Sequence, residues 1–221
     1  MPHIEQLSPH IANLIAAGEV VERPASVVKE LLENAIDAGA RNVAVELQNG
    51  GLTYLRVTDD GCGIAPDELP TAFLRHATSK LRTAADLAAI GTLGFRGEAL
   101  AAISAVSRID LLTKAEDSPG VSLHLDAGQI TQEAPAGCPE GTTILVRDLF
   151  YNTPARMKFM KSDQAEASAV FLAVQQQALA HPEIAFRFLK DGQEQLSTAG
   201  SGDRMAAIYT VFGREIANNM I

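Results

Sequence analysis

The pattern of apolar and polar positions changes from a helical period to a strand period within the first sixty residues. Helices are expected over residues 8–18 and 24–39, since each stretch has proline in its first turn and glycine at its end. Two β-rich runs follow over 42–47 and 52–58. They are separated by Asn49-Gly50-Gly51, which favours a hairpin turn. The start of the chain therefore predicts two helices followed by a β-hairpin.

The rest of the chain combines further short strands with a few helices. Helical patterns cover 66–75, 98–106 and 162–180. Strand patterns cover 109–113, 121–125, 129–133, 142–146 and 184–189. Strands gathered around a few helices favour an α+β sandwich. Residues 76–97 are rich in threonine, serine and glycine with poor periodicity, and a loop of this length is usually either a functional lid or disordered.

A possible domain boundary lies near the end of the chain. Ala199-Gly200-Ser201-Gly202 has the composition of a linker. The residues after it are too few to bury a core of their own. We therefore expect one domain over 1–199 and the start of a second, truncated domain over 200–221.

Composition is that of an ordinary globular protein. Hydrophobic residues make up 47% and charged residues 20% of the 221 residues, so a packed core is expected and general disorder is not. The chain has 27 acidic and 18 basic residues, for a net charge of -9. This charge argues against a surface that binds nucleic acid all over, although it is compatible with a local basic groove.

Cysteine spacing and the lengths of the apolar runs indicate the cellular compartment of the protein. The two cysteines, Cys62 and Cys138, have no spacing typical of a zinc site, and a reduced, intracellular setting is the simpler interpretation. No basic region followed by an apolar run opens the chain, and no segment approaches about 20 uninterrupted apolar residues. We expect a cytoplasmic protein with no membrane association.

The second predicted helix carries the most informative polar face. At 3.6 residues per turn, Glu30, Glu33, Asn34 and Asp37 share one face, opposite a face of apolar residues. An ordinary amphipathic helix explains this partition equally well. The functional interpretation is that one carboxylate orients or deprotonates a water, while Asn34 offers an oxygen to a hard cation such as magnesium that bridges phosphates. Glu33 and Asp37 have no assigned role.

A glycine-containing acidic turn follows the second strand. In Asp59-Asp60-Gly61-Cys62-Gly63 the glycines permit a tight turn beside a ligand, and an aspartate there could accept a hydrogen bond from the amine of adenine and select against guanine. The alternative is a simple acidic turn. A dinucleotide-binding fingerprint is excluded because it would need glycine at Pro66, and the phosphate-binding loop of P-loop proteins is absent.

The irregular stretch before the helix at Glu98 has features of a phosphate-binding loop. Gly91, Gly94 and Gly97 recur every third residue and lead into that helix, whose free amides could bind phosphate. Three cations lie in or beside the same stretch, which suits a lid over a triphosphate. They are Arg75, Lys80 and Arg96. Scattered surface cations would give the same pattern.

Taken in order, these motifs resemble those of the ATPase superfamily that contains gyrase B, heat-shock chaperones, histidine kinases and MutL. The matching stretches are Glu30-x-x-x-Asn34, Asp59-x-Gly61-x-Gly63, Gly94-Phe95-Arg96-Gly97-Glu98-Ala99-Leu100 and Gly141-Thr142-Thr143. Three further stretches resemble the MutL family of mismatch repair proteins specifically. They are Ile15-Ala16-Ala17-Gly18-Glu19-Val20-Val21, Arg75-His76-Ala77-Thr78-Ser79-Lys80 and Phe150-Tyr151-Asn152-Thr153-Pro154-Ala155-Arg156.

The resemblance implies a fold and a role for individual residues. The fold would be a two-layer sandwich with a mixed, mainly antiparallel sheet covered by helices on one face, and with ATP and Mg²⁺ between the helices and a lid. Glu30 would be the general base, Asn34 the magnesium ligand and Asp59 the adenine-selecting carboxylate. Further nucleotide contacts would come from Gly63 and Thr143 at the base, from Thr78, Ser79 and Lys80 in the lid, and from Gly94, Phe95, Arg96 and Gly97 at the phosphates.

The resemblance also implies a biological role. Residues 1–199 would be an ATP-binding domain, and ATP would drive association of two N-terminal regions, coupling mismatch recognition by a MutS-type protein to strand removal. DNA would be bound mainly by regions beyond this chain, and the full protein would be a homodimer. The family's second domain supplies a lysine to the terminal phosphate, and no matching position occurs here. One alternative is therefore a nucleotide-binding interaction module without turnover, and another is a histidine kinase catalytic domain.

Overall fold

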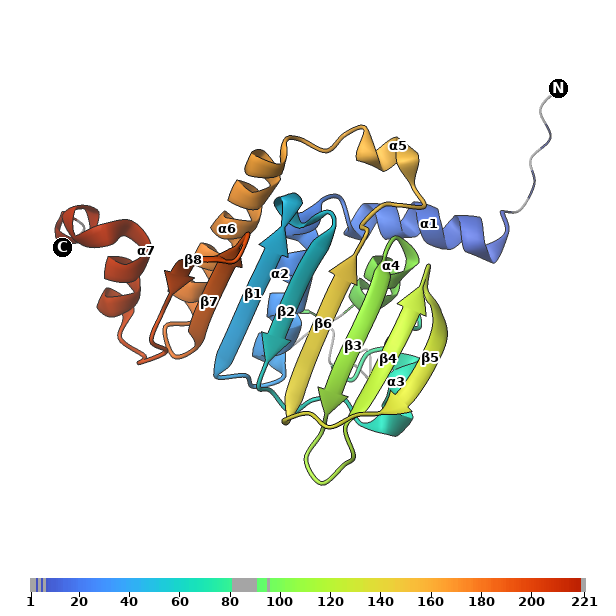
Figure 1. The fold of residues 1–221 in the computed structure, drawn as a ribbon, viewed down its shortest axis with the longest axis horizontal. Coiled ribbons are helices and arrows are strands. Elements are labelled where there is room, and N and C mark those ends of the chain that lie inside the picture. Colours follow the sequence, from blue (N-terminus) through green and yellow to red (C-terminus); the bar gives the residue numbers. More distant parts are fainter. Residues whose placement is uncertain (1–2, 4, 6, 81–90, 95, 220–221) are drawn as a thin grey trace.

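One mixed sheet organises the computed structural model, which describes residues 3, 5, 7–80, 91–94 and 96–219. Its eight strands lie in the order β5-β4-β3-β6-β2-β1-β7-β8 (Figure 1). Their bounds are β1 Asn42–Gln48, β2 Tyr54–Asp59, β3 Arg108–Lys114, β4 Val121–Asp126, β5 Gln129–Pro135, β6 Gly141–Arg147, β7 Ala185–Lys190 and β8 Gln193–Ser197. Neighbouring strands are antiparallel except β1 and β7, which are parallel. The expected mixed, mainly antiparallel sheet is confirmed.

Helices cover one face of this sheet (Figure 1). The helices are α1 Pro9–Val20, α2 Pro24–Asp37, α3 Leu69–Ala72, α4 Ala99–Ala105, α5 Pro154–Met157, α6 Asp163–Ala180 and α7 Arg204–Asn218, with short 3-10 turns η1 Asn49–Gly51 and η2 Pro66–Glu68. Burial alternates along the strands, as in β3, where Ile109, Leu111 and Thr113 are buried. This two-residue period places alternate side chains in the core beneath α2, α4 and α6. The α+β sandwich is therefore confirmed.

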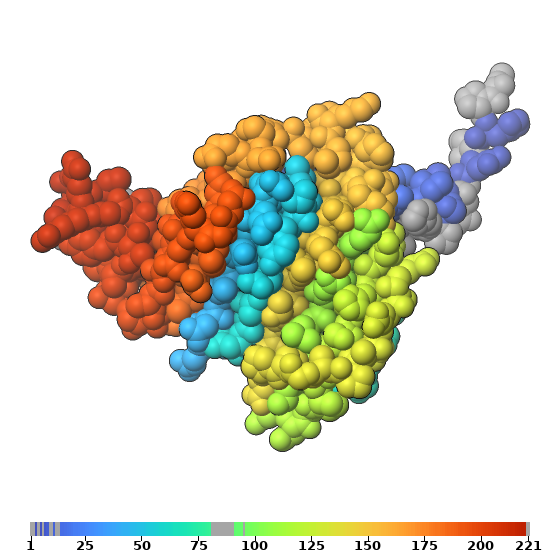
Figure 2. Space-filling view, in the orientation of Figure 1, coloured from blue at the N-terminus to red at the C-terminus, as the bar shows by residue number. Residues whose placement is uncertain are grey.

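The other face of the sheet, which is turned toward the viewer in Figure 2, carries charged residues in cross-strand pairs. Arg56 donates to Glu46 at 2.5 Å, and Arg187 donates to Glu194 at 2.6 Å. Pairs of this kind satisfy charges on a surface that the helices leave uncovered. In the described residues, no helix is long and apolar enough to cross a membrane.

Several predicted elements differ from the observed ones for local reasons. The helix expected over 66–75 is instead η2 followed by the single turn α3, because Pro70, inside the expected helix, lacks the N–H that a continuous helix needs. Strand β8 was missed because only Leu196 among its five residues is buried, which gives an edge strand no apolar alternation. The short α5 and the helix α7 were also not predicted. Residues 81–90 of the expected loop lie outside the described residues.

The stretch with linker composition is attached to the sheet. The N–H of Gly202 donates to the carbonyl of Pro182 at 2.9 Å, and Thr198 is bonded to Phe186 in both directions. Asp203 then caps α7 by accepting from the N–H groups of Met205 and Ala206, as short polar side chains commonly do at helix starts. Helix α7 packs beside α6 and β8. The division at residue 199 remains a prediction.

Candidate functional site

Helix α2 forms one wall of the candidate site because its two faces have different partners. Its apolar face is buried in the core. The buried residues are Val27, Val28, Leu31, Leu32 and Ala35. Glu30, Asn34 and Asp37 are half-buried on the other face, where the sequence pattern places them. The predicted polar face is therefore present, and its end meets two other segments.

A charged cluster joins this end of α2 to residues far along the chain. The Lys80 Nζ atom donates to Asn34 Oδ1 at 3.0 Å and to Asp37 Oδ2 at 2.5 Å. The N–H of Leu93 donates to Asp37 Oδ1 at 3.0 Å, and the N–H of Gly94 donates to Asp37 Oδ2 at 3.1 Å. Burial by itself would raise the pKa of Asp37, but these donors together lower it. Asp37, to which the sequence assigned no role, is therefore the centre of this cluster.

Two glycines allow the chain segments of this cluster to approach each other. Gly97 has φ of 61°, and a Cβ atom there would lie 2.4 Å from the carbonyl oxygen of Ala77. A Cβ at Gly94 would lie 3.3 Å from Lys80 Nζ. Glu98 then pairs with Arg75 at 3.5 Å. The stretches around Lys80 and Gly94, separate in the sequence, thus form one region beside α2.

Glu30 lies on the same face of α2, one turn before Asn34. Its pKa is raised, first by burial and then by the nearby charge of Glu33. The charges of Lys29, Lys80 and Arg96 oppose this rise. Because burial raises its pKa, a buried carboxylate is a stronger base than an exposed one. The cations nearby can attract an anionic ligand to the same place.

The turn after β2 separates its two aspartates into different roles. Asp59 Oδ1 accepts from the N–H of Gly61 at 2.9 Å. Burial raises the pKa of Asp59, while hydrogen bonds from the backbone N–H groups of Gly61 and Thr142 oppose the rise. Asp60 points elsewhere and accepts from the N–H groups of Arg41 and Asn42, each at 2.8 Å. Asp60 therefore fixes the start of β1, and Asp59 is the carboxylate available to the site.

Close backbone contacts hold this turn against α2 and β3. The N–H of Cys62 donates to the carbonyl of Ala38, just after α2, at 3.0 Å. Gly63 has φ of 67°, and a Cβ there would lie 2.1 Å from the carbonyl oxygen of Lys114. The N–H of Ile64 donates to Thr113 Oγ1 at 3.0 Å. Only glycine fits at position 63, because both its conformation and the space beside it exclude a side chain.

The structure does not bring Thr143 to Asp59. Strand register pairs Thr143 with Thr58, and their hydroxyl groups are 3.1 Å apart on the sheet face away from the helices. Asp59 pairs with Thr142 instead, and the Thr142 hydroxyl lies 3.0 Å from that of buried Thr113. Successive strand residues face opposite sides of a sheet. Thr142 is therefore the threonine on the side of Asp59, which corrects the placement expected for Thr143.

The remaining predicted residues have mixed placements. The Thr78 hydroxyl accepts from the N–H of Lys80 at 3.1 Å, so it shapes the backbone beside the cluster. Ser79 is exposed. Arg96 is also exposed, and its charge acts on Glu30. Phe95 lies outside the described residues.

Two of the stretches that narrowed the resemblance pack against each other away from this cluster. Arg156 donates to the carbonyl of Val21 at 2.9 Å. A Cβ on Gly18 would lie 1.6 Å from the guanidinium of Arg156. Glycine at position 18 therefore leaves the space through which Arg156 crosses α1. Their contact holds α1 in place, and it has no direct part in the charged cluster.

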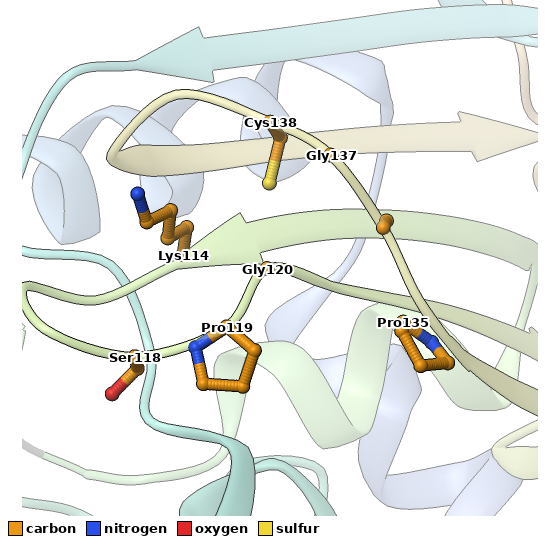
Figure 3. A pocket seen from close by; sticks show the side chains of 8 residues that line it. Lys114, Ser118, Pro119, Gly120, Pro135, Gly137 and Cys138 are labelled. Atoms are coloured by element: carbon orange, nitrogen blue, oxygen red, sulfur yellow. The ribbon is translucent and has the colours of Figure 1, made fainter.

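A separate cavity opens between the turns at one end of β3, β4 and β5 (Figure 3). Its volume is about 450 Å³, and its lining includes Lys114, Pro119 and Cys138. None of the predicted site residues lines it. The cavity adjoins the candidate site through Lys114, whose carbonyl packs against Gly63, and through Cys138, whose thiol lies 3.6 Å from the carbonyl oxygen of Thr113.

Comparison with known proteins identifies the family of this arrangement. A family model described as histidine kinase-, DNA gyrase B-, and HSP90-like ATPase matches residues 22–146, more than half of the chain. This range includes α2, the Asp59 turn and the cluster around Lys80.

Curated relatives are similar over the whole chain. The DNA mismatch repair protein MutL of Agathobacter rectalis is 49% identical over 222 residues, covering 100% of this chain and 34% of that protein. The MutL of Symbiobacterium thermophilum is 50% identical, covering 100% of this chain and 35% of that protein. The chain thus spans about a third of the length of these relatives.

Solved structures agree with this similarity. The Aquifex aeolicus MutL ATPase domain complexed with ADP matches with a TM-score of 0.73 and 32% identity, covering 87% of this chain and 70% of that chain. The N-terminal domain of a DNA repair protein matches with a TM-score of 0.77 and 29% identity, covering 91% and 60%. The chain therefore belongs to the histidine kinase-, DNA gyrase B- and HSP90-like ATPase family and, within it, to the ATPase domains of MutL mismatch repair proteins.

Proposed function

We propose that this chain binds ATP along the polar face of α2 and hydrolyses it as part of a longer protein. The observation that carries the proposal is the convergence of Lys80 and two backbone N–H groups on the end of α2 that bears Asn34. An ammonium group and adjacent amides are the donors that bind phosphate oxygens in proteins. The structure of a MutL ATPase domain complexed with ADP supports the same ligand class.

The base of the nucleotide would lie at the other end of the site, near Asp59. The Asp59 carboxylate can accept a hydrogen bond from the amine of adenine, whereas guanine presents an acceptor oxygen at that position. Thr142 and Thr113 face the same side of the sheet and bring hydroxyl groups to it. Gly63 would shape this end of the site by letting the turn after Asp59 pack against the backbone of Lys114, where a Cβ atom would lie 2.1 Å from the carbonyl oxygen.

Glu30 would act as the general base. Its carboxylate faces the same side of α2 as Asn34, and burial raises its pKa, which makes it a better proton acceptor. It would orient the attacking water and take its proton. The charges of Lys29, Lys80 and Arg96 oppose the rise in the pKa of Glu30 and so favour its ionised form.

Magnesium fits the same end of the helix. The Asn34 Oδ1 atom and the Asp37 carboxylate already hold one cationic group, the ammonium of Lys80. Magnesium commonly takes only one or two protein ligands and completes its shell with phosphate oxygens and water. When bound, the ion would neutralise negative charge on the phosphates. Asn34 is the residue we propose as its ligand.

At the level of the whole protein, we propose an ATP-dependent switch in mismatch repair. ATP binding would drive association of two N-terminal regions, and the complex would link a MutS-type recognition protein to strand removal on DNA. Residues 1–199 would be the ATP-binding domain, with 200–221 opening a second domain. The support is the whole-chain similarity to MutL proteins, of which this chain spans about a third.

The test of hydrolysis is the substitution Glu30→Gln in the full-length protein. We expect ATP turnover to fall by about 100-fold or more, because a positioned general base contributes about that much. ATP binding should change little, since glutamine keeps the shape of the side chain. Steady-state phosphate release and equilibrium binding of ATP measure the two effects.

The matched control is Glu33→Gln, which removes a carboxylate one turn later, at the edge of the same face. Glu33 pairs weakly with Lys29 at 3.7 Å, and its charge contributes to the raised pKa of Glu30, but we do not propose that it contacts the water or the nucleotide. Turnover should therefore fall far less in Glu33→Gln than in Glu30→Gln. Unchanged turnover in Glu30→Gln would show that another group activates the water.

A further inference from the structure

The Asp37 carboxylate accepts hydrogen bonds from three donors of the proposed phosphate site. One of its oxygens accepts from the N–H of Leu93, and the other accepts from the N–H of Gly94 and from Lys80 Nζ. The side chain of Asp37 is only 7% exposed and that of Lys80 is 19% exposed. An anion surrounded in this way is bound as a phosphate would be.

Helix stability does not explain a carboxylate at this position. Asp37 is the last residue of α2, where the helix carries partial negative charge and favours cations. Its charge is compensated instead by Lys80 and by the amides of a segment more than fifty residues away. The contacts of Asp37 are therefore with the site and not with its own helix.

The same donors cannot serve Asp37 and a phosphate group fully at once. Each backbone N–H supplies one proton, and those of Leu93 and Gly94 are both directed at Asp37. Lys80 has three donor protons, and two of them are used by Asn34 and Asp37. A phosphate that binds these amides must therefore displace the carboxylate.

We propose that Asp37 is a positioning residue that acts as an internal anion, holding Lys80 and the amides of Leu93 and Gly94 in place until the phosphates of the nucleotide replace it. The inference rests on the proposed ATP site and adds a competition within it. The apparent affinity for a competing anion equals the intrinsic affinity multiplied by the fraction of molecules in which these donors are free. Asp37 thus preserves the arrangement of the donors at the expense of phosphate affinity.

The first test measures the reactivity of Lys80 without any nucleotide. An acylating reagent modifies the free ε-amine, and mass spectrometry of the digested protein quantifies modification at each lysine. Asp37→Asn removes the charge that holds Lys80, so modification of Lys80 should rise by about three-fold or more relative to the exposed Lys158 in the same sample. The control Glu33→Gln should leave Lys80 unchanged. Equal modification in Asp37→Asn and the unsubstituted protein would overturn the proposal.

The second test measures phosphate binding without adenine or magnesium. Inorganic triphosphate is titrated into the full-length protein in the presence of a chelator, and heat of binding gives the dissociation constant. Removing the internal anion should tighten binding in Asp37→Asn by about three-fold or more, with Glu33→Gln as the control. A residue needed only for structure would weaken binding when it is replaced. Weaker or unchanged binding in Asp37→Asn therefore contradicts the proposal.

A third measurement needs no substitution and serves if Asp37→Asn does not fold. Amide hydrogen exchange of the unsubstituted protein should show the Leu93 and Gly94 amides protected both without ligand and with saturating triphosphate. Rapid exchange of both amides in the ligand-free protein would overturn the inference. Failure of the proposed function can be distinguished from failure of this inference. A protein that binds no ATP could still show Asp37-dependent protection of Lys80 from acylation.

Discussion

At the scale of single residues, adjacent positions in this protein have unrelated roles because strand geometry separates them. Thr142 and Thr143 are neighbours on β6, yet Thr142 faces Thr113 and Asp59 while Thr143 faces Thr58 on the uncovered side of the sheet. Asp59 and Asp60 also have different partners, because Asp59 ends β2 and Asp60 begins the turn after it. The residue type alone does not reveal which member of each pair belongs to the site.

The threonine pair gives a direct test of this geometry. Thr142→Val replaces a hydroxyl group on the side of Asp59 with a methyl group of the same size. We expect it to weaken ATP binding by about ten-fold, the effect of losing one hydrogen-bonding group. Thr143→Val should leave ATP binding unchanged, because its hydroxyl bonds to Thr58 away from the site. Equilibrium binding of ATP to the two variants measures these effects. An equal loss of ATP affinity in both variants would refute the assignment of Thr142 to the site.

At the scale of elements, polar contacts between helices position the wall of the site. Arg23, the residue that precedes α2, donates through Nε and a terminal nitrogen to the two oxygens of Glu166 in α6, at 3.1 and 2.9 Å. Glu166 is fully buried and also accepts from the N–H of Lys161 at 2.9 Å. This contact joins the starts of α2 and α6. The orientation of the polar face of α2 therefore depends on a residue more than 140 positions away.

Replacing Glu166 with glutamine should destabilise the protein by about 2 kcal/mol near pH 7, because it breaks a buried ion pair whose arginine is partly exposed. Burial opposes ionisation of Glu166, but the hydrogen bonds from Arg23 and from the N–H of Lys161, together with the charges of both residues, outweigh it and lower the pKa. The stabilisation is therefore complete above the pKa of an unfolded glutamate, about 4.3, and is lost as pH falls through the lower pKa of the folded state. Denaturant unfolding across this range measures it.

The control for this prediction is Glu194→Gln, which breaks an exposed pair with Arg187 on the open face of the sheet. Exposed pairs contribute about 0 to 1 kcal/mol, so little change is expected. The difference in unfolding free energy between the Glu166 variant and the unsubstituted protein should shrink as the pH falls. If this difference stayed constant down to pH 3, ionisation of Glu166 would not be its source.

The contact of Gly18 with Arg156 predicts a specific coupling between α1 and the segment before α6. In a helix, alanine is about 1 kcal/mol more favourable than glycine. Gly18→Ala should nevertheless not stabilise the protein, because the added Cβ displaces Arg156 from Val21. In an Arg156→Ala background the same substitution should stabilise it. Unfolding free energies of the four proteins give the coupling, expected at about 1–2 kcal/mol, and additivity would contradict the contact.

At the scale of the whole molecule, the sheet has a covered face that builds the site and an uncovered face of paired charges. On the uncovered face, Arg147 pairs with Asp110 at 2.5 Å and Arg56 with Glu46 at 2.5 Å. Cross-strand pairing of this kind leaves the surface without a block of positive charge. This arrangement agrees with the net charge of -9.

The whole-molecule prediction concerns the length of the chain needed for turnover. We expect residues 1–221 alone to bind ATP but to hydrolyse it about 100-fold more slowly than the full-length protein, because the resemblance places a phosphate-binding lysine in a second domain and one such donor contributes about that much. Phosphate release from the two proteins at saturating ATP tests it. Equal rates would show that residues 1–221 contain the complete catalytic site.

Much of the fold and part of the site follow from local patterns. The period of α2 places Glu30 and Asn34 on one face opposite a buried apolar face, and this face is where the site forms. Strand β8 could not be predicted in this way because it is polar and is stabilised by pairing with β7. The role of Asp37 could not be predicted either, because its partners are Lys80 and the amides of Leu93 and Gly94.

By itself, the sequence determined most of the helices and strands, their order, the polar face of α2 and the family to which the motifs belong, because helical period, turn residues and motif spacing are properties of neighbouring positions. Only the tertiary structure decided that Thr142 faces Asp59, that Gly18 makes room for Arg156, and that Asp37 holds the donors of the proposed phosphate site. Strand register and contacts between distant segments settle such questions, since they depend on how the whole chain packs.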